Sequence, residues 1–528
     1  MPKVLISDKL SPAAVEIFRA RGIEADVKTG LSPAELRAVI GDYDGLAIRS
    51  ATKVTAELLA AAKNLKVVGR AGIGVDNVDV KAATASGVVV MNTPHGNAIT
   101  TAEHAIALMF ALARQIPEAS ASTKAGKWEK NRFLGVELYG KTLGIIGCGN
   151  IGSIVADRAQ GLKMKVIAYD PFLSEARAVA LGVEKVDLHD LFARADIVTL
   201  HAPLTEGTRH IIDARAIGQM KRGVRIINCA RGGLIVEKDL YDALVAGHVA
   251  GAALDVFETE PATESPLFGL ENVVCTPHLG ASTMEAQENV ALQIAEQMSD
   301  FLLTGAVTNA INMPSVSAED APRLKPYMEL ARLLGAFAGQ LSVARDGGFR
   351  SVAIEYEGHA AQLNHTPLTA AALAGLLGPL MEGVNMVNAP VIARERGIEL
   401  TETVHDRPSE YQTLIRIAVT TDRDTRVVAG TLIAGSRPRL VEVKGIPVEA
   451  DFSRHMLYVT NEDKPGFIGR FGTTLAEAAV NIATMHLGRT APGGDAICLV
   501  SVDAPVPAEV LERVRGLPLV KQATPLSF

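Results

Sequence analysis

The chain has few of the features that mark metal-binding, secreted or membrane-spanning proteins. Its four cysteines, Cys148, Cys229, Cys275 and Cys498, are far apart and form no CxxC pair. This spacing argues against a zinc site or a disulfide framework and fits a reducing cytoplasm, so we expect no metal and a cytoplasmic location. The N-terminal stretch MPKVLISDKL lacks the basic region and apolar core of a secretory signal. The longest apolar helix candidate, AIALMFALA, has about half the length of a membrane span.

Neither sign of charge dominates the sequence. The formal net charge is -7 and acidic and basic residues are interspersed, which gives no reason to expect a nucleic-acid partner. Apolar residues make up 48% of the chain, enough to form buried cores. Because 528 residues are too many for one core, we expect about two to four domains.

Short apolar runs alternate with helical patterns over roughly the first half of the chain. KVLISD, GLAIRS, LKVVGRAG and GVVVMN are typical of strands, and SPAAVEIFRARG and TAELLAAAKN are typical of helices. This alternation predicts parallel strands joined by crossover helices. TTAE at 100–103 has the pattern of a capping box and predicts the start of a long bridging helix at Thr100. A second α/β series then runs from KTLGIIGCGNIG to NVVCTPHLG.

The C-terminal part has a different organisation. The helical stretch STMEAQENVALQIAEQMSDFL should return to the first domain, and NMPSVSAEDAPRLKP is typical of a linker. Residues from about 326 to 450 mix strand and helix patterns without recognisable chemistry. From about His455 the order of elements is strand, helix, strand, strand, helix, strand, which predicts a small ferredoxin-like sandwich.

The segment GCGNIG at 147–152 has the spacing of a dinucleotide-binding loop, with Gly147, Gly149 and Gly152. It follows an apolar strand and opens a helix, so the first glycine permits a tight turn, the second admits a pyrophosphate, and the third allows close helix packing. The phosphates would lie at the helix N-terminus. The next strand ends in Asp170, which would bind the ribose hydroxyls and oppose a 2′-phosphate. Since Pro171 replaces the arginine that NADP sites often use, we predict NAD as the cofactor.

Four polar residues follow the later strands of the second series: Arg231, Asp255, Glu260 and His278. Ligands of open α/β sheets bind beyond the carboxyl ends of the strands, so these side chains should converge beside the nicotinamide. Taken singly, each fits a plainer reading: a surface arginine, a solvated loop acid or a packed histidine. Their common placement instead predicts a reaction centre.

Oxidation of a secondary alcohol with NAD assigns roles to these residues. The reaction needs a base for the hydroxyl proton and a fixed cation for the oxygen and a neighbouring carboxylate. His278 is the natural base, because its unperturbed pKa lies near neutrality. Glu260 can hold the imidazole and stabilise its protonated form, and Arg231 can bind both oxygens through its planar fork.

The longer segments around these residues include NCARGG, LDVFETEP, TPHLGAST, VVGRAGIGVDNVD, MNTPHGN and TAEHAIALMFALARQIP. They resemble the D-2-hydroxyacid dehydrogenase family over residues 1 to about 310. The family's catalytic arginine, glutamate and histidine correspond to Arg231, Glu260 and His278. At Ile73 the family often has threonine, so only the backbone or methyl groups of Ile73 could serve. The implied NAD contacts are Ile73, Asn150, Ile151, Asp170, Ala202, Cys229, Ala230, Arg231, Asp255, His278, Leu279, Gly280 and Ala281.

Basic and small residues also lie at strand exits of the first series, in RSATK and GRAGIGVDN. The glycines would let backbone N–H groups approach a carboxylate, and the cations favour a phosphoryl group. By resemblance, Arg132 in GKWEKNRF can reach the active site from a neighbouring subunit. The substrate-binding candidates are Arg49, Ser50, Lys53, Arg70, Gly72, Gly74 and Arg132. The resemblance is closest to members that oxidise 3-phospho-D-glycerate at the start of L-serine biosynthesis, although plain 2-hydroxy acids and 2-oxoglutarate remain alternatives.

The C-terminal stretch NEDKPGFIGRFGTTLAEAAVNI resembles the start of an ACT domain, a small-molecule sensor of amino-acid metabolism. In related dehydrogenases such domains pair across subunits and bind serine near these turns. The resemblance therefore implies L-serine as a possible effector, Asp463 and Asn481 as its contacts, and a homo-oligomer, most simply a tetramer. Asn461 stands where relatives carry other polar or aromatic groups.

Together, the patterns and the resemblance imply an α/β fold. A Rossmann-type NAD domain at 100–283 is expected inside a flavodoxin-like substrate domain at 1–99 and 284–310. An α+β intervening domain at 318–452 and a ferredoxin-like ACT domain at 455–528 should follow. Two other functions are compatible with parts of this pattern: a hydroxypyruvate or glyoxylate reductase, and an NADH-sensing binding protein. The extra cations and the C-terminal extension argue against the first, and nothing in the sequence indicates a peptide groove for the second.

Overall fold

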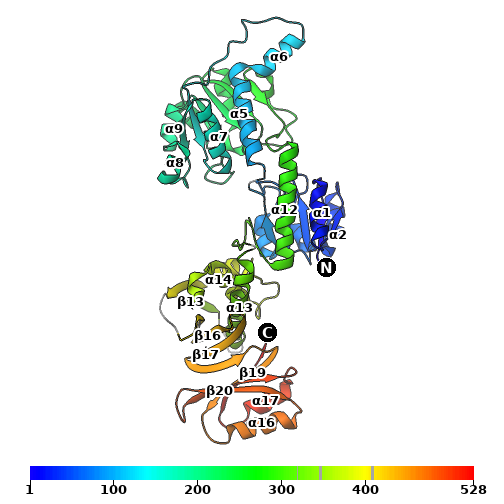
Figure 1. Cartoon of the computed structure of the whole chain (residues 1–528), viewed down its shortest axis with the longest axis vertical. Helices are drawn as coiled ribbons and strands as arrows, with labels where there is room; N and C mark the ends of the chain where they lie inside the picture. Colours follow the sequence, from blue (N-terminus) through cyan, green and yellow to red (C-terminus); the bar gives the residue numbers. More distant parts are fainter. Residues whose placement is uncertain (95, 318, 344–347, 406–409) are drawn as a thin grey trace.

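The structure, a computed structural model, describes residues 1–94, 96–317, 319–343, 348–405 and 410–528. Four sheets follow one another along an elongated molecule, which confirms the expected α/β architecture (Figure 1). We refer to each sheet with its helices as the first to the fourth domain, in chain order. Residue 318, at which the intervening domain was expected to begin, lies outside the described residues. Among the described helices, none combines the length and the apolar character needed to cross a membrane.

The first domain is a parallel sheet of order β2-β1-β3-β4-β5, the flavodoxin-like order. Its strands are β1 Lys3–Ile6, β2 Glu24–Val27, β3 Gly45–Ile48, β4 Val67–Arg70 and β5 Val89–Met91. Its own helices are α1 Pro12–Ala20, α2 Pro33–Val39, α3 Ala56–Ala61 and α4 Val80–Ala85. As expected, α12 (Met284–Thr304) returns to this sheet and packs beside α1. It begins where the Thr283 hydroxyl accepts the Ala286 N–H, and it ends at Gly305, whose φ of 79° is readily available only to glycine.

The second domain is a parallel sheet of order β12-β11-β10-β9-β6-β7-β8. Strands β6 to β11 are arranged in the order β8-β7-β6-β9-β10-β11, which is the Rossmann order. The cofactor crevice is therefore expected where β6 and β9 lie side by side. The strands are β6 Thr142–Ile146, β7 Lys165–Tyr169, β8 Glu184–Lys185, β9 Ile197–Leu200, β10 Val224–Asn228, β11 Val249–Leu254 and β12 Val273–Cys275. The helices are α5 Ala98–Arg114, α6 Ile116–Lys124, α7 Asn150–Gly161, α8 Glu175–Leu181, α9 Leu188–Arg194, α10 Ala214–Gln219 and α11 Glu237–Val245.

Two local predictions were wrong. Helix α5 begins at Ala98 rather than after Thr100, so Thr100 lies in its first turn, where its hydroxyl lies 3.4 Å from that of Thr283 at the start of α12 instead of capping the helix. The stretch 312–326 is a linker only in its first part, since helix α13 already begins at Ala321 and contains Pro326. Asn312 fixes the linker to the first domain, where its side chain accepts the Val90 N–H at 2.9 Å.

The third domain is a six-stranded sheet of order β14-β13-β15-β16-β17-β18, covered by two closely packed helices. Its strands are β13 Phe349–Gly358, β14 Glu399–His405, β15 Thr413–Thr421, β16 Thr425–Ile433, β17 Arg437–Val443 and β18 Ile446–Asp451. Its helices are α13 Ala321–Val343, α14 His365–Leu377 and α15 Ala389–Glu395. Close packing of α13 on α14 depends on glycine: a methyl group on Gly375 would overlap the carbonyl of Arg332, and one on Gly339 would overlap the carbonyl of Leu376.

The loop between α14 and α15 joins the third domain to the first. The side-chain amide of Asn385 donates to the carbonyl of Gly87 at 2.9 Å, and that of Asn388 donates to the carbonyl of Ala85 at 3.3 Å. Both acceptors lie at the C-terminal end of α4. Val387, between the two asparagines, is buried in the core of the first domain.

The fourth domain confirms the expected ferredoxin-like order of strands and helices. It consists of β19 His455–Glu462, α16 Phe467–Glu477, β20 Ile482–Arg489, β21 Asp495–Val502, α17 Ala508–Arg515 and β22 Val520–Ser527. The sheet order is β20-β21-β19-β22. One face of this sheet packs on α16 and α17. The other face joins the core of the third domain through Met456, Tyr458, Ile497, Leu499 and Leu526.

The close packing of α13 on α14 leads to a first prediction. Gly375→Ala should destabilise the third and fourth domains by about 1–3 kcal/mol, because an added methyl group must displace the α13 backbone. Gly218→Ala is the matched control, since Gly218 is also helical and has open space at the position of a methyl group. Thermal unfolding of both variants checks this: equal midpoints would show that α13 and α14 are not packed as described.

Candidate active site

A histidine and a glutamate form a hydrogen-bonded pair beyond the strands of the second domain. Nδ1 of His278 lies 2.7 Å from Oε2 of Glu260, and the Phe257 N–H donates to the other carboxylate oxygen at 3.1 Å. The hydrogen bond with Glu260 raises the pKa of His278 despite partial burial. Burial favours the neutral acid at Glu260, but the bond to His278 prevails and lowers the pKa of this carboxyl group. Because Nδ1 is engaged, Nε2 is the nitrogen left for a substrate.

Arg231 leaves the end of β10 and reaches the first domain. Its Nε donates to a carboxylate oxygen of Asp76 at 2.8 Å, and one terminal nitrogen donates to the carbonyl of Ala230 at 2.7 Å. The other terminal nitrogen lies against Gly74 so closely that a methyl group there would overlap it. An arginine at this strand exit therefore spans the cleft between the two domains.

A second guanidinium group lies on the same glycine turn. Arg70, at the end of β4, packs against Gly72, where a side chain would overlap it. Burial and the neighbouring Arg231 lower the pKa of Arg70 to about 10, although Asp76 acts in the opposite direction. The buried Nε of Arg70 has no hydrogen-bond partner among the described residues. Buried cations of one sign are stabilised by an anion, so the turn is suited to a negatively charged ligand.

The loop that carries Arg49 lies beside this turn. Asp8 accepts the backbone N–H groups of Arg49 at 2.7 Å and Thr52 at 3.1 Å, and the amide of Asn77 donates to the carbonyl of Arg49 at 2.7 Å. These bonds hold the Arg49 backbone next to the glycine turn. Ser50 and Lys53 are exposed on the same loop.

Arg132 lies outside the cleft of its own chain. Its guanidinium group binds Glu129 at 3.1 Å and Glu271 at 2.7 Å. Glu271 precedes β12, so it lies at the edge of the sheet opposite the strand exits. The contact expected from a neighbouring subunit stays a prediction.

The glycine-rich loop has the shape that a dinucleotide requires. Gly147 has a φ of 91°, and a methyl group on Gly152 would overlap the carbonyl of Gly147, so the first turn of α7 packs directly on the loop. Gly149 has open space where a side chain would lie, which leaves the backbone accessible at the start of α7. The carboxylate of Asp170 accepts the N–H groups of Cys148 and Phe172, both at 2.8 Å, and so lies beside this loop. These residues fit an NAD molecule with its pyrophosphate at the helix N-terminus.

The other expected cofactor contacts surround the same cleft. Asn150 and Ile151 open α7, Ala202 follows β9, and Cys229 and Ala230 follow β10, while Ile73 lies on the glycine turn of the first domain. Burial raises the pKa of Cys229, so its thiol is neutral. Leu279, Gly280 and Ala281 follow His278. Asp255 differs from the other expected contacts. Its side chain is only 1% exposed and accepts the N–H groups of Leu279 and Gly280, so it points toward the loop after His278 rather than into the cleft.

The two expected effector residues do not come together within one chain. Asp463 accepts hydrogen bonds from Arg489 at 2.7 Å and from the Gly493 N–H at 3.2 Å, and the bond to Arg489 lowers its pKa. Asn481 instead donates to Asp503 at 2.8 Å. Helix α16, of 11 residues, separates the two positions and is about 16 Å long. A ligand touching both would need the seam between two subunits.

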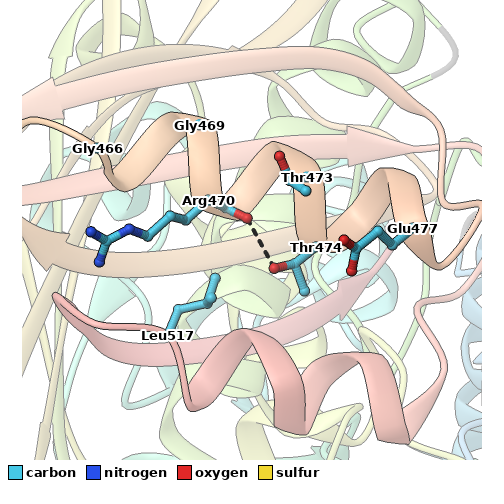
Figure 2. Close-up of a pocket in the computed structure, with 7 residues that line it drawn as sticks. All are labelled: Gly466, Gly469, Arg470, Thr473, Thr474, Glu477 and Leu517. Atoms are coloured by element: carbon cyan, nitrogen blue, oxygen red, sulfur yellow. Dashed lines mark hydrogen bonds between the residues drawn. The ribbon is translucent and has the colours of Figure 1, made fainter.

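Two cavities of the C-terminal half were not expected from the sequence. Figure 2 shows the first, of about 500 Å³, along α16 on the side that faces Leu517. It is lined by Gly466, Gly469, Arg470, Thr473, Thr474, Glu477 and Leu517, and the Thr474 hydroxyl donates to the Arg470 carbonyl within it. The second, of about 860 Å³, lies between α13, α14 and β22. The sequence also left Asp76 unassigned, although its place in GIGVDN, two residues after Gly74, was a usable signal.

Comparison with known proteins places the chain in a family. Residues 106–280 match the NAD-binding domain of D-isomer specific 2-hydroxyacid dehydrogenases, residues 323–444 the intervening domain of D-3-phosphoglycerate dehydrogenase, and residues 455–519 the ACT domain. A D-3-phosphoglycerate dehydrogenase from Methanocaldococcus jannaschii is 44% identical over 100% of both chains. One from Bacillus subtilis is 42% identical over 98% of each chain.

Solved structures agree over the first two domains. A glyoxylate reductase from Paecilomyes thermophila, 31% identical, superposes with a TM-score of 0.55 on 59% of this chain and 98% of its own. The TT0316 protein from Thermus thermophilus, 35% identical, gives a TM-score of 0.54 on 58% of this chain and 99% of its own. The expected NAD-linked dehydrogenase domain is thus confirmed, and the chain belongs to the D-3-phosphoglycerate dehydrogenase family.

Proposed function

We propose that this enzyme oxidises 3-phospho-D-glycerate to 3-phosphooxypyruvate with NAD, the first step of phosphorylated L-serine biosynthesis. The observation that carries the proposal is the guanidinium pair on one glycine turn, Arg70 and Arg231, opposite the hydrogen-bonded His278 and Glu260. This arrangement provides cations for a carboxylate and a phosphoryl group, and an acid–base group for an alcohol. Relatives identical to this chain at 42–44% over nearly its whole length carry the corresponding name.

The chemistry follows from the side chains. Arg231 binds the substrate carboxylate and the alcohol oxygen, with the N–H groups of the glycine turn beside it. Arg49, Arg70 and Lys53 bind the phosphoryl group. His278 removes the hydroxyl proton through Nε2, and Glu260 stabilises the imidazolium ion that results. When bound, NAD would accept the hydride that leaves carbon 2; this hydride carries both electrons lost by the alcohol, and the hydroxyl proton goes to His278.

The nearest alternative is a reductase of hydroxypyruvate or glyoxylate. Initial rates with NAD and 3-phospho-D-glycerate, compared with NADH and hydroxypyruvate, glyoxylate or 2-oxoglutarate, distinguish these activities. An NADH-binding protein without turnover would show none of them. We expect the phosphorylated substrate to have the highest kcat/KM.

We further propose that the enzyme is cytoplasmic and forms a homo-oligomer, most simply a tetramer. We also keep the proposed domain boundaries, which are 1–99 with 284–310, 100–283, 318–452 and 455–528. Support for oligomerisation comes from large apolar side chains that are exposed around and after α6, including Ile116, Trp128, Leu134 and Tyr139. Arg132 lies in the same segment. An interface there would bring this cation near a second subunit.

The phosphoryl contact leads to a prediction that tests the proposed function directly. Arg70→Met should lower kcat/KM for 3-phospho-D-glycerate by roughly 10- to 100-fold, the usual effect of losing a hydrogen bond to a charged group. Unphosphorylated D-glycerate should be affected much less. Arg37→Met is the matched control, because Arg37 forms an exposed ion pair with Glu57 away from the strand exits. Equal losses with both substrates would remove Arg70 from phosphate binding.

The acid–base pair leads to a prediction on pH dependence. Oxidation requires neutral His278, so kcat/KM should rise as pH increases through the raised pKa of this residue. Glu260→Gln removes the charge that stabilises the imidazolium ion, so this rise should move to lower pH. His278→Ala should reduce kcat by roughly 10²–10⁴-fold. An unmoved profile in Glu260→Gln would exclude Glu260 from the proposed role.

We also expect L-serine to inhibit through the ACT domain. A coupling of about 1–3 kcal/mol would change substrate affinity by about 5- to 150-fold. Asp463→Ala and Asn481→Ala should each relieve inhibition and leave activity without serine unchanged. These substitutions are sharper than deletion from His455 onward, which would remove Met456, Tyr458 and their neighbours from the core of the third domain. The measurement is the initial rate of each protein as a function of L-serine concentration. A wild-type enzyme whose rate is unchanged by millimolar L-serine would contradict the prediction.

A further inference from the structure

The loop that carries His278 is held by a buried carboxylate. Asp255 accepts the N–H of Leu279 at 2.7 Å and that of Gly280 at 2.8 Å, and its own carbonyl accepts the His278 N–H at 2.9 Å. The Thr276 hydroxyl donates to the same carboxylate at 2.6 Å. Asp255 therefore fixes the backbone on both sides of His278.

This restraint is needed because the backbone of His278 is strained. Its φ of 55° lies in the left-handed region, which a non-glycine residue occupies at a cost of roughly 1–3 kcal/mol. Without external bonds the loop would relax, and Nδ1 of His278 would leave Glu260. The geometry of the proposed acid–base pair thus depends on the charge and the position of Asp255.

His104, on helix α5, completes the surroundings of Asp255. Its Nε2 lies 3.2 Å from a carboxylate oxygen of Asp255 and 3.2 Å from the Thr276 hydroxyl. The carboxylate can only accept, and the Thr276 proton already points to it, so Nε2 must carry the hydrogen. The side chain of His104 is 19% exposed, and α5 holds the loop a second time through Thr101, whose hydroxyl donates to the Gly280 carbonyl at 2.9 Å.

We propose that His104 is a positioning residue for the reaction, which it supports by donating from Nε2 to the Thr276 hydroxyl beside the Asp255 carboxylate and so fixing the loop 276–280 that presents His278. The inference rests on the proposed function, since it assumes that His278 is the acid–base group. Burial alone would raise the pKa of Asp255, but hydrogen bonds from His104, Thr276 and Leu279 together lower it. The donor on α5 therefore helps to keep the carboxylate charged, and the charged form is the better acceptor for the loop amides.

Three variants test the role of His104. His104→Leu removes the donor and keeps an apolar side chain of moderate size, whereas His104→Gln keeps an amide N–H at the end of a side chain of similar reach. His248→Leu is the matched control, because His248 lies in the same domain and its ring forms a hydrogen bond with a backbone carbonyl, that of Met220, at 3.2 Å. Each full-length variant is assayed with NAD and 3-phospho-D-glycerate.

We expect His104→Leu to lower kcat by roughly 10- to 100-fold, the scale of a small misplacement of a reacting group, and to leave KM within about twofold. His104→Gln should recover most of the loss, and His248→Leu should behave as wild type. An unchanged kcat in His104→Leu would overturn the proposal. So would equal losses in the Leu and Gln variants, because they would point to packing rather than to the hydrogen bond.

Hydrogen exchange without substrate makes the inference independent of the reaction. The amides of Leu279 and Gly280 should exchange faster in His104→Leu than in wild type, and His104→Gln should restore their protection. Unchanged protection in His104→Leu would overturn the positioning role. A different outcome is that the wild-type enzyme is inactive with 3-phospho-D-glycerate while the three proteins still differ in exchange as expected. That result would refute the proposed substrate and would still support the positioning role of His104.

Discussion

The close approach of Arg231 to Gly74 is the contact on which the proposed active site depends. It is made between two domains, so both must be folded and correctly placed before the guanidinium group lies on the glycine turn. Arg70 approaches the same turn from the first domain, and any side chain at position 72 or 74 would displace one of the two arginines. Burial and, after it, the like charge of Arg231 lower the pKa of Arg70, so the two guanidinium groups disfavour one another in the absence of an anion. The proposed anionic substrate would relieve this repulsion, which would give binding a driving force beyond its own hydrogen bonds.

The parts of the fold that the sequence predicted were those with local or periodic patterns. The glycine loop at 147–152, the alternation of strands and helices, and the order of elements after His455 all belong to this class, because each depends on neighbours in the chain. Strand exits also brought Arg231, Glu260 and His278 to one cleft, since the carboxyl ends of parallel strands share an edge. Helix boundaries were predicted less well: Thr100 has a local capping pattern, yet it lies inside the first turn of α5, which begins at Ala98.

Long-range partners could not be predicted from these patterns. Nothing local to Arg132 shows that Glu271 would hold it at the opposite edge of the sheet, and nothing near Asp463 shows that Arg489 would bind it. Asp255 is buried and bonded to Leu279 and Gly280 because the ends of β11 and β12 lie side by side in the sheet. This pairing joins residues far apart in the chain, so local sequence patterns do not predict it. A sequence pattern identifies such residues as polar and near the site, whereas the structure shows which of them are bound to other parts of the protein, as Arg132 is to Glu271 and Asp255 is to the loop after His278.

The core shared by the third and fourth domains has a consequence for building chimeric enzymes. Because Met456, Tyr458, Ile497, Leu499 and Leu526 are buried against α13 and the neighbouring sheet, an ACT domain taken from another protein would need to supply five matching side chains at once. The linker before α13 adds Val316 to the same core. The unit that can be exchanged between dehydrogenases is therefore the pair of C-terminal domains together with Val316 and with the asparagine loop through which it binds α4.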